Sequence, residues 1–446
     1  MSAPFNAGKA WGVNARLLAC VCIVLAARLF WFIHRYAVNM MFWDQWGLWD
    51  GMFSGAGAWR LFNWQLGPHR EGLGYLVIKL TAIASDWDTK TEAYVIGVLF
   101  LLSTALALAI KWRLTRRWSI FDVCIPLIIL TLGNVEAYAG TTNPAHGPVP
   151  LLLILAIVLG RLLPLGFARA ALTLVLQFFV VFSGFGLLFG PVGCALFLLD
   201  LAAAIRERKQ IVPQALALAG SIFVLALFFH GYVFEASVDC FVFPDPHPLR
   251  YVQFAAGMIL RALQLHDLPK LRSLAAVGLV AVGVWLLAWS GWGTVKSLAR
   301  SPVHGTVFAL TAFSWLFIAT TAVGRVCNGE GAAYGSRYVS YTLLMLLAGY
   351  LAAQGAAVSE TTRTALLALC LLLFAVKEVR TRRSMGEAQW YRDRKQHWKD
   401  CYLRTLDVKT CDRQGMPVVP DETGLLIAPK LRYLREHHLN LFKRGE

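Results

Sequence analysis

The chain has 446 residues, of which 57% are hydrophobic and only 15% are charged. Soluble globular domains carry about 25% charged residues, so this composition excludes both a set of ordinary soluble domains and a disordered chain. The 42 lysines and arginines outnumber the 26 acidic residues, giving a formal charge of +16. Basic residues collect in the cytoplasmic loops of membrane proteins, which explains this excess more simply than nucleic-acid binding does. We therefore expect an all-α polytopic membrane protein with membrane lipids, and no nucleic acid, among its partners.

Long apolar runs along the chain predict about eleven transmembrane helices, because a bilayer-crossing helix needs about 20 mostly apolar residues. The runs cover residues 17–33, 93–110, 120–132, 149–163, 170–188, 192–205, 212–232, 273–289, 303–323, 339–357 and 364–376. Arg16 precedes the first run, which predicts a cytoplasmic N-terminus. The basic short loops then fall on the same face, and they cover residues 111–117, 161–169, 206–209 and 296–300.

The remaining loops fall on the outer face under this topology, and they cover residues 36–92, 133–147, 233–272 and 324–338. We divide the chain into a transmembrane domain, 1–380, and an amphipathic extramembrane tail, 381–446, which we also place outside. The tail begins with basic residues, so a cytoplasmic tail is the alternative. We interpret residues 251–263 as an amphipathic surface segment, because an extra crossing there would reverse the topology of everything after it.

Four cysteines fall in the regions that we place outside, where disulfides can form. Our preferred pair is Cys401 with Cys411, and a second possible pair is Cys240 with Cys327. Four free thiols are the alternative interpretation.

The first outer loop, residues 36–92, begins with an acid between tryptophans. Asp44 lies between Trp43 and Trp46, just past the outer end of the first apolar run. With Trp49, these tryptophans recur every three residues, which suits one face of a short interfacial helix. Anchoring at the lipid headgroups is the alternative interpretation of the tryptophans. Since anchoring does not explain a carboxylate among them, Asp44 is our candidate catalytic residue.

Further along this loop, His69, Arg70 and Glu71 precede an apolar segment that is too short to span a membrane, 75–84. We expect a second interfacial or re-entrant helix there. Helix N-termini favour anions, and an arginine fork suits phosphate. We therefore assign these three residues to a substrate- or phosphate-binding site, with a solvated charged turn as the alternative.

Two later outer loops also carry polar residues of interest. In the second outer loop, Glu136 and His146 are candidate ligands of a divalent metal, or groups that orient a sugar, although two ligands do not make a metal site. In the fourth outer loop, Arg325 and Arg337 bracket a glycine-rich turn, and Tyr338 follows. Arginine near membrane depth usually has a partner, and a lipid phosphate is a suitable one. Snorkelling of these arginines to the headgroups is the alternative.

An N-terminal helix followed by a long outer loop with an acid near its start resembles the GT-C superfamily of integral-membrane glycosyltransferases. The short motifs that carry this resemblance are Trp43-Asp44-Gln45-Trp46, His69-Arg70 and Ser336-Arg337-Tyr338. The resemblance implies a polyprenyl-phosphate sugar donor and a hydroxyl acceptor on a cell-envelope glycan or lipid. It also implies inversion at the anomeric carbon and a bacterial inner-membrane enzyme whose active site faces the periplasm.

The resemblance also implies roles for individual residues. Asp44 would be the general base, arginines such as Arg70, Arg325 and Arg337 would hold the departing phosphate, and Trp43 and Trp46 would stack on the sugar or line the lipid path. Many relatives carry paired acids in the second outer loop, where this chain has one glutamate and one histidine, so metal dependence stays open.

Two other functions fit the same composition. An O-antigen ligase or polymerase also uses a polyprenyl-linked donor, but its largest loop usually lies late in the chain. A non-enzymatic flippase or transporter of lipid-linked glycans would be expected to show internal repeats or charges at the membrane midplane. We find no convincing repeat in this sequence.

Overall fold

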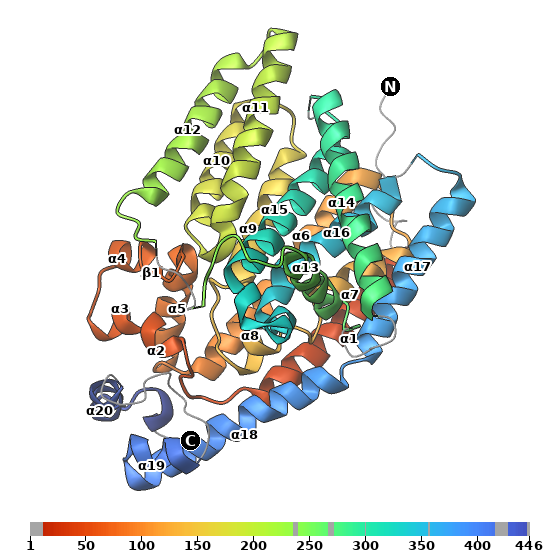
Figure 1. Cartoon of the computed structure of the whole chain (residues 1–446). Helices are drawn as coiled ribbons and strands as arrows, with labels where there is room; N and C mark the ends of the chain where they lie inside the picture. Colours follow the sequence, from red (N-terminus) through yellow and green to blue (C-terminus); the bar gives the residue numbers. More distant parts are fainter. Residues whose placement is uncertain are drawn as a thin grey trace.

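The computed structural model describes residues 12–234, 240–265, 272–298, 300–355, 357–414 and 427–443. These residues form an almost entirely helical protein (Figure 1), which confirms the predicted all-α class. The β-structure of the described part is one small antiparallel hairpin of β1 (Gln65–Leu66) and β2 (His69–Arg70).

Six helices are long and apolar enough to cross a membrane, and α11 is extended at its start by a short 3-10 segment, η2 (Gly184–Leu188). They are α1 (Val13–Tyr36), α6 (Thr89–Thr115), α11 (Phe189–Glu207), α12 (Ile211–Phe229), α14 (Arg272–Lys296) and α15 (Pro302–Arg325). The other predicted runs fall on η1 (Ile120–Val123) with α7 (Cys124–Ile129), α9 (Pro148–Arg161), α10 (Phe167–Val181), α16 (Val339–Gly355) and α17 (Glu360–Val379). Each apolar run therefore contains helix, but length and composition support six membrane crossings in the described part, and the count of eleven stays a prediction.

Exposed apolar side chains and a capped helix start are both consistent with membrane helices in these segments. Large apolar side chains such as Leu102, Phe223 and Trp285 are exposed on the long helices, as expected for a protein embedded in lipid. Helix α6 begins where the Asp88 side chain accepts hydrogen bonds from two backbone N–H groups, which satisfies donors that a helix start leaves open. Apolar exposure together with well-formed helix ends supports a membrane-embedded bundle.

Three of the basic loops that the sequence places on one face, 161–169, 206–209 and 296–300, lie at the same end of the helices in the structure. Arg161 at the end of α9 and Arg169 in α10 both bind Asp200 of α11. Glu207, which follows Asp200 at the end of α11, pairs with Arg300. We call this the basic-loop end of the bundle.

The predicted outer loops meet at the opposite end of the bundle, which we call the outer-loop end. The first outer loop forms α2 (Gln45–Leu48), α3 (Asp50–Phe53), α4 (Ala58–Phe62), the hairpin and α5 (Gly72–Ser85). The later loops contribute α8 (Val135–Ala139), α13 (Leu249–Ala262), η3 (Val326–Asn328), η4 (Glu330–Tyr334) and η5 (Ser336–Tyr338). Helix α13 is seen end-on in Figure 1. Its residues are buried from Phe254 to Ala262, so the prediction of a surface segment over 251–263 is wrong for most of the helix, because neighbouring elements cover it on all sides.

The tryptophans of the first outer loop do not share one face of a single interfacial helix. Trp43 has a positive φ of 50° and is part-exposed, whereas Trp46 and Trp49 are buried. The segment breaks into α2 and α3, and the two buried tryptophans join a core that also contains Trp87 and Trp398. Burial in protein, rather than anchoring at headgroups, therefore explains Trp46 and Trp49.

The C-terminal tail packs on the first outer loop instead of forming a separate appendage. It consists of α18 (Arg382–Thr405), α19 (Val408–Gln414), α20 (Ala428–Glu436) and η6 (Asn440–Phe442), and Figure 1 shows it along the outer-loop end. The Asn39 amide donates to the Asn440 carbonyl over 2.9 Å, and the Asn440 amide donates to the Trp87 carbonyl over 2.8 Å. These bonds join residues 401 and 353 positions apart, so the tail and the loop lie on the same side of the bundle.

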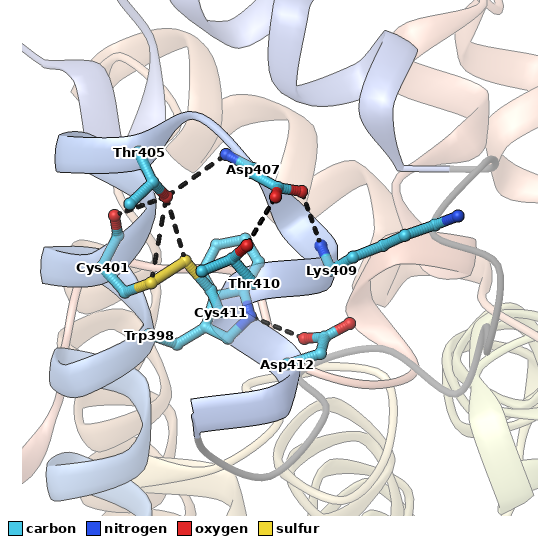
Figure 2. Close-up of a disulfide and its surroundings, with 8 residues drawn as sticks. All are labelled: Trp398, Cys401, Thr405, Asp407, Lys409, Thr410, Cys411 and Asp412. Atoms are coloured by element: carbon cyan, nitrogen blue, oxygen red, sulfur yellow. Dashed lines mark hydrogen bonds between the residues drawn. A yellow bond between two sulfur atoms is a disulfide. The ribbon is translucent and has the colours of Figure 1, made fainter.

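Both predicted disulfides are present in the structure. Cys240 is bonded to Cys327, and Cys401 to Cys411. Figure 2 shows the second bond joining α18 to α19, where the Trp398 indole donates to the Asp412 carboxylate over 2.7 Å. The bond and this contact hold the turn between α18 and α19 in a compact form.

Candidate functional site

The candidate site lies at the outer-loop end, where three outer loops and the tail converge. Gln45 anchors the start of the first loop: its amide donates to the Thr142 hydroxyl over 2.6 Å and to the Thr142 carbonyl over 3.0 Å. Its side-chain oxygen accepts from the Phe42 backbone over 3.0 Å. Because the neighbouring residue is held so firmly, Asp44 occupies a fixed position, yet its side chain is 52% exposed. Asp44 is therefore a positioned and accessible carboxylate.

Arg337 of η5 lies between two carboxylates that come from different loops. Its Nε is 3.2 Å from an oxygen of Glu136, and its Nη1 is 3.9 Å from an oxygen of Asp44. The Glu136 carboxylate raises the pKa of Arg337, so this guanidinium stays charged. Burial raises the pKa of Glu136, and Arg337 opposes that rise. The Arg337 side chain is 46% exposed, so part of its positive charge faces a ligand or solvent.

The tail holds this arginine segment in place. The Ser336 hydroxyl accepts a hydrogen bond from the Glu136 backbone N–H over 3.1 Å and donates to Glu387 of α18 over 2.7 Å. Glu387 also pairs with Arg261 of α13 at 2.6 Å. A tail to which the sequence assigned no chemistry therefore helps to position Arg337.

A second polar group, next to the first, consists of His69, Glu71 and His146. The Nε2 atoms of the two imidazoles contact each other. The Oε1 atom of Glu71 lies 3.1 Å from Nε2 of His146 and 3.4 Å from Nε2 of His69. The Asn143 amide donates to the other oxygen of Glu71 over 3.2 Å. The predicted metal ligand His146 is thus brought together with His69 and Glu71, whereas Glu136 lies with Arg337.

The electrostatics of this group follow from its burial. Burial alone would raise the pKa of Glu71, but the two imidazoles hold it well below its usual range. Burial and His146 lower the pKa of His69. Burial alone would lower the pKa of His146, but the Glu71 carboxylate has the larger combined effect and raises that pKa. The Asp44 carboxylate adds a smaller upward contribution to the pKa of both histidines, although that of His69 stays lowered on balance, and this ties the second group electrostatically to the first.

Close backbone packing brings these residues together. Gly72, which follows Glu71, has φ +51°, and a Cβ there would lie 2.2 Å from the Phe182 carbonyl oxygen. At Gly74 a Cβ would lie 2.3 Å from the Cβ of Ala145. Only glycine permits both approaches. The start of α5 can therefore press against the second outer loop and place Glu71 beside His146.

The remaining predicted site residues lie around these two groups. Arg70 turns away from them: its guanidinium donates to the carbonyls of Phe228, His230 and Asn63 over 2.8–3.1 Å. Arg70 thereby ties the first outer loop to the end of α12, and burial lowers its pKa.

Arg325 and Tyr338 flank the arginine segment. Arg325 ends α15, and its charge and that of Arg337 lower the pKa of the Tyr338 hydroxyl, although burial raises that pKa more. Tyr338 itself is buried and packs against Phe317. Both residues are therefore close enough to shape the electrostatics around Arg337.

Comparison with protein-family models, with curated proteins and with solved structures gives no match. The function is therefore argued from the geometry of the site.

Proposed function

We propose that the protein is a membrane glycosyltransferase that moves a sugar from a polyprenyl-phosphate donor to a hydroxyl acceptor, with Asp44 as general base. The acceptor would be a cell-envelope glycan or lipid. The observation that supports this proposal is the pairing of an accessible carboxylate, Asp44, with an accessible guanidinium, Arg337, at the outer-loop end. A base and an anion-binding cation side by side are what a displacement at a phosphate-linked carbon requires.

In the proposed reaction, Asp44 accepts the proton of the acceptor hydroxyl. The hydroxyl oxygen then forms a bond to the anomeric carbon, and the bond between that carbon and the phosphate oxygen breaks. Its electron pair leaves with the polyprenyl phosphate, so the anomeric centre is inverted. Arg337 stabilises the negative charge that grows on the departing phosphate, an effect that is strong where water is excluded.

Neighbouring residues have supporting roles in this proposal. Glu136 and Ser336 orient Arg337, and Arg325 adds positive charge near the phosphate. Trp43, which is part-exposed beside Asp44, offers an aromatic face for the sugar. Trp46 and Arg70 are buried and act as structural supports of the loop, not as direct ligands.

The proposed location is the bacterial inner membrane, with the site facing the periplasm. Long apolar helices support a membrane-embedded protein. Two disulfides, Cys240–Cys327 and Cys401–Cys411, lie with the outer loops and the tail, and disulfides persist in oxidising compartments. A lipid-held donor then meets the base in a fixed orientation, which favours reaction.

The test is sugar transfer by the purified protein in nanodiscs, with a panel of radiolabelled polyprenyl-phosphate monosaccharides and membrane-derived acceptors. We expect Asp44→Asn to lower transfer about 100- to 10,000-fold, the usual contribution of a general base. The matched control is Asp50→Asn in the same loop, since Asp50 is similarly exposed at 46% and pairs with Lys430 of the tail. Wild-type transfer in Asp44→Asn would refute the role of Asp44. Movement of lipid-linked sugar without release of polyprenyl phosphate would favour a transporter.

A further inference from the structure

The group formed by His69, Glu71 and His146 has the geometry of a metal site. One ligand atom from each residue lies within 4.8 Å of the other two. A tetrahedral zinc ion with bonds of about 2.0–2.1 Å holds its ligand atoms about 3.3 Å apart. The Glu71 oxygen lies 3.1 Å and 3.4 Å from the two imidazole nitrogens, which matches that separation.

The charge balance of the group also calls for a cation. The Glu71 side chain is fully buried, and a buried carboxylate is costly unless a positive charge accompanies it. Among the described residues, its side-chain contacts are two imidazoles and the neutral amide of Asn143. The positive charge must therefore come from a proton on a histidine or from an ion held between the three ligand atoms.

The ligands are held as a metal-binding set would be. Asn143 fixes the second oxygen of Glu71, the kind of outer contact that orients metal ligands. The ring of Phe185 packs against the imidazoles of both His69 and His146. Because His146 is 25% exposed while the other two side chains are buried, the group opens on the side of His146.

We propose that His69, Glu71 and His146 form a binding site for a divalent transition metal of the zinc class. Two imidazoles and one carboxylate suit zinc and its neighbours better than magnesium or calcium, which prefer all-oxygen ligands. Three protein ligands leave a fourth position open, as in catalytic zinc sites. The Nε2 atoms of His69 and His146 contact each other in this structure. When a metal ion binds between them, they move apart to a distance similar to the 3.1 Å and 3.4 Å that separate them from Oε1 of Glu71.

The metal site and the first polar group are connected through neighbouring residues of two loops. Gln45 follows Asp44 directly and binds Thr142, and the next residue, Asn143, binds Glu71. The contacts of the adjacent residues Thr142 and Asn143 therefore link the segment that carries Asp44 to Glu71 of the metal site. An anionic oxygen, such as one of a phosphate, would be a suitable fourth ligand at the open position. This last role rests on the proposed function, whereas the metal site itself does not.

The experiment measures metal binding directly. The full-length protein in detergent is stripped with a chelator, then loaded separately with Zn²⁺, Co²⁺, Mn²⁺ or Mg²⁺, and its metal content is determined by mass spectrometry. We expect about one equivalent of zinc or cobalt and no retained magnesium, with the visible absorption of four-coordinate Co²⁺.

Variants locate the metal. His146→Ala should abolish retention of zinc, and Asn143→Ala should weaken zinc affinity about 10- to 100-fold. The control is His34→Ala in α1, because His34 contacts Tyr94 and is remote from the site in the sequence. His146 is preferred over Glu71 as the test position because it is partly exposed, and gel filtration checks that each variant is folded.

Two results would overturn the proposal: no zinc or cobalt retained by the wild type, or wild-type affinity in His146→Ala. In the first case a proton shared by the histidines is the cation beside Glu71. The sugar-transfer assay is scored separately. Transfer by a protein that retains neither zinc nor cobalt would remove this inference and leave the proposed function standing. Retention of zinc by a protein that transfers no sugar would do the reverse.

Discussion

The two ends of the helical bundle use charged residues in opposite ways. At the basic-loop end, Asp200 is buried and receives three hydrogen bonds of 2.7–3.0 Å from Arg161 and Arg169. At the outer-loop end, Asp44 is half exposed and lies 3.9 Å from Arg337. One carboxylate is saturated by its partners, and the other keeps most of its hydrogen-bonding capacity free.

This difference distinguishes an aspartate that stabilises the fold, Asp200, from one that is available for a reaction, Asp44. A buried, fully paired carboxylate holds helices together and cannot accept a further proton without losing its partners. A carboxylate that is positioned by a neighbour, as Asp44 is by Gln45, can be accessible without being mobile. Removing a charge at the basic-loop end should therefore lower stability. Removing Asp44 or Arg337 at the outer-loop end should lower activity.

The largest effect is expected for Asp200→Ala. This change leaves two buried arginines without their carboxylate, and breaking a buried ion pair costs about 3–5 kcal/mol. We expect a clearly lower melting temperature in detergent. An unchanged melting temperature would mean that Asp200 is not the structural counterpart of Asp44.

The next effect is expected for Arg337→Gln, and it should appear in transfer. Loss of a group that stabilises developing negative charge lowers turnover about 100- to 1,000-fold. The variant also leaves the nearly buried Glu136 without its cation, so we expect a lower melting temperature, but by less than in Asp200→Ala because Arg337 itself is 46% exposed. Arg70→Gln is the contrasting variant, because it leaves buried carbonyls unpaired at a cost of about 1–3 kcal/mol each. Equal loss of stability in both variants would contradict the assignment of Arg337.

A pH effect is expected from Lys395 of α18, a buried charge at the outer-loop end. Burial lowers the pKa of Lys395 to about 7, although Glu92 opposes this. In the unfolded chain a lysine keeps its proton up to about pH 10.4. Between these values the unfolded chain binds more protons, so stability should rise with pH, by at most about 1.4 kcal/mol per pH unit. Lys395→Met should remove this rise, as melting temperatures measured from pH 7 to pH 10 would reveal.

The smallest effect is expected for Glu207→Gln at the basic-loop end. Glu207 pairs with Arg300 at 2.6 Å, but both side chains are more than 40% exposed. Exposed ion pairs contribute about 0–1 kcal/mol. We expect both the melting temperature and the transfer rate to stay at wild-type values. A large loss of stability here would show that burial does not set the value of charge pairs in this protein.

The sequence predicted the features that depend on local composition. Apolar runs identified the helical segments, such as α1 and α6, because the length and hydropathy of a segment are properties of consecutive residues. The order of those runs along the chain also predicted that basic loops share one face and placed four cysteines in the outer regions. The preferred pair and the possible pair among them are both bonded in the structure. Asp44 and Arg337 could be singled out because each lies near an apolar run, Asp44 beyond the end of 17–33 and Arg337 just before 339–357.

The tertiary structure alone decided how the loops meet. His69 and His146 are 77 residues apart, and only the close approach of α5 to the second outer loop places both beside Glu71. Nothing in the local pattern distinguishes Arg70, which binds carbonyls, from Arg337, which lies between carboxylates. Hydropathy fixes which segments enter the membrane, but side-chain partners depend on packing between segments that are distant in the chain. That packing decided that the tail completes the site through Glu387.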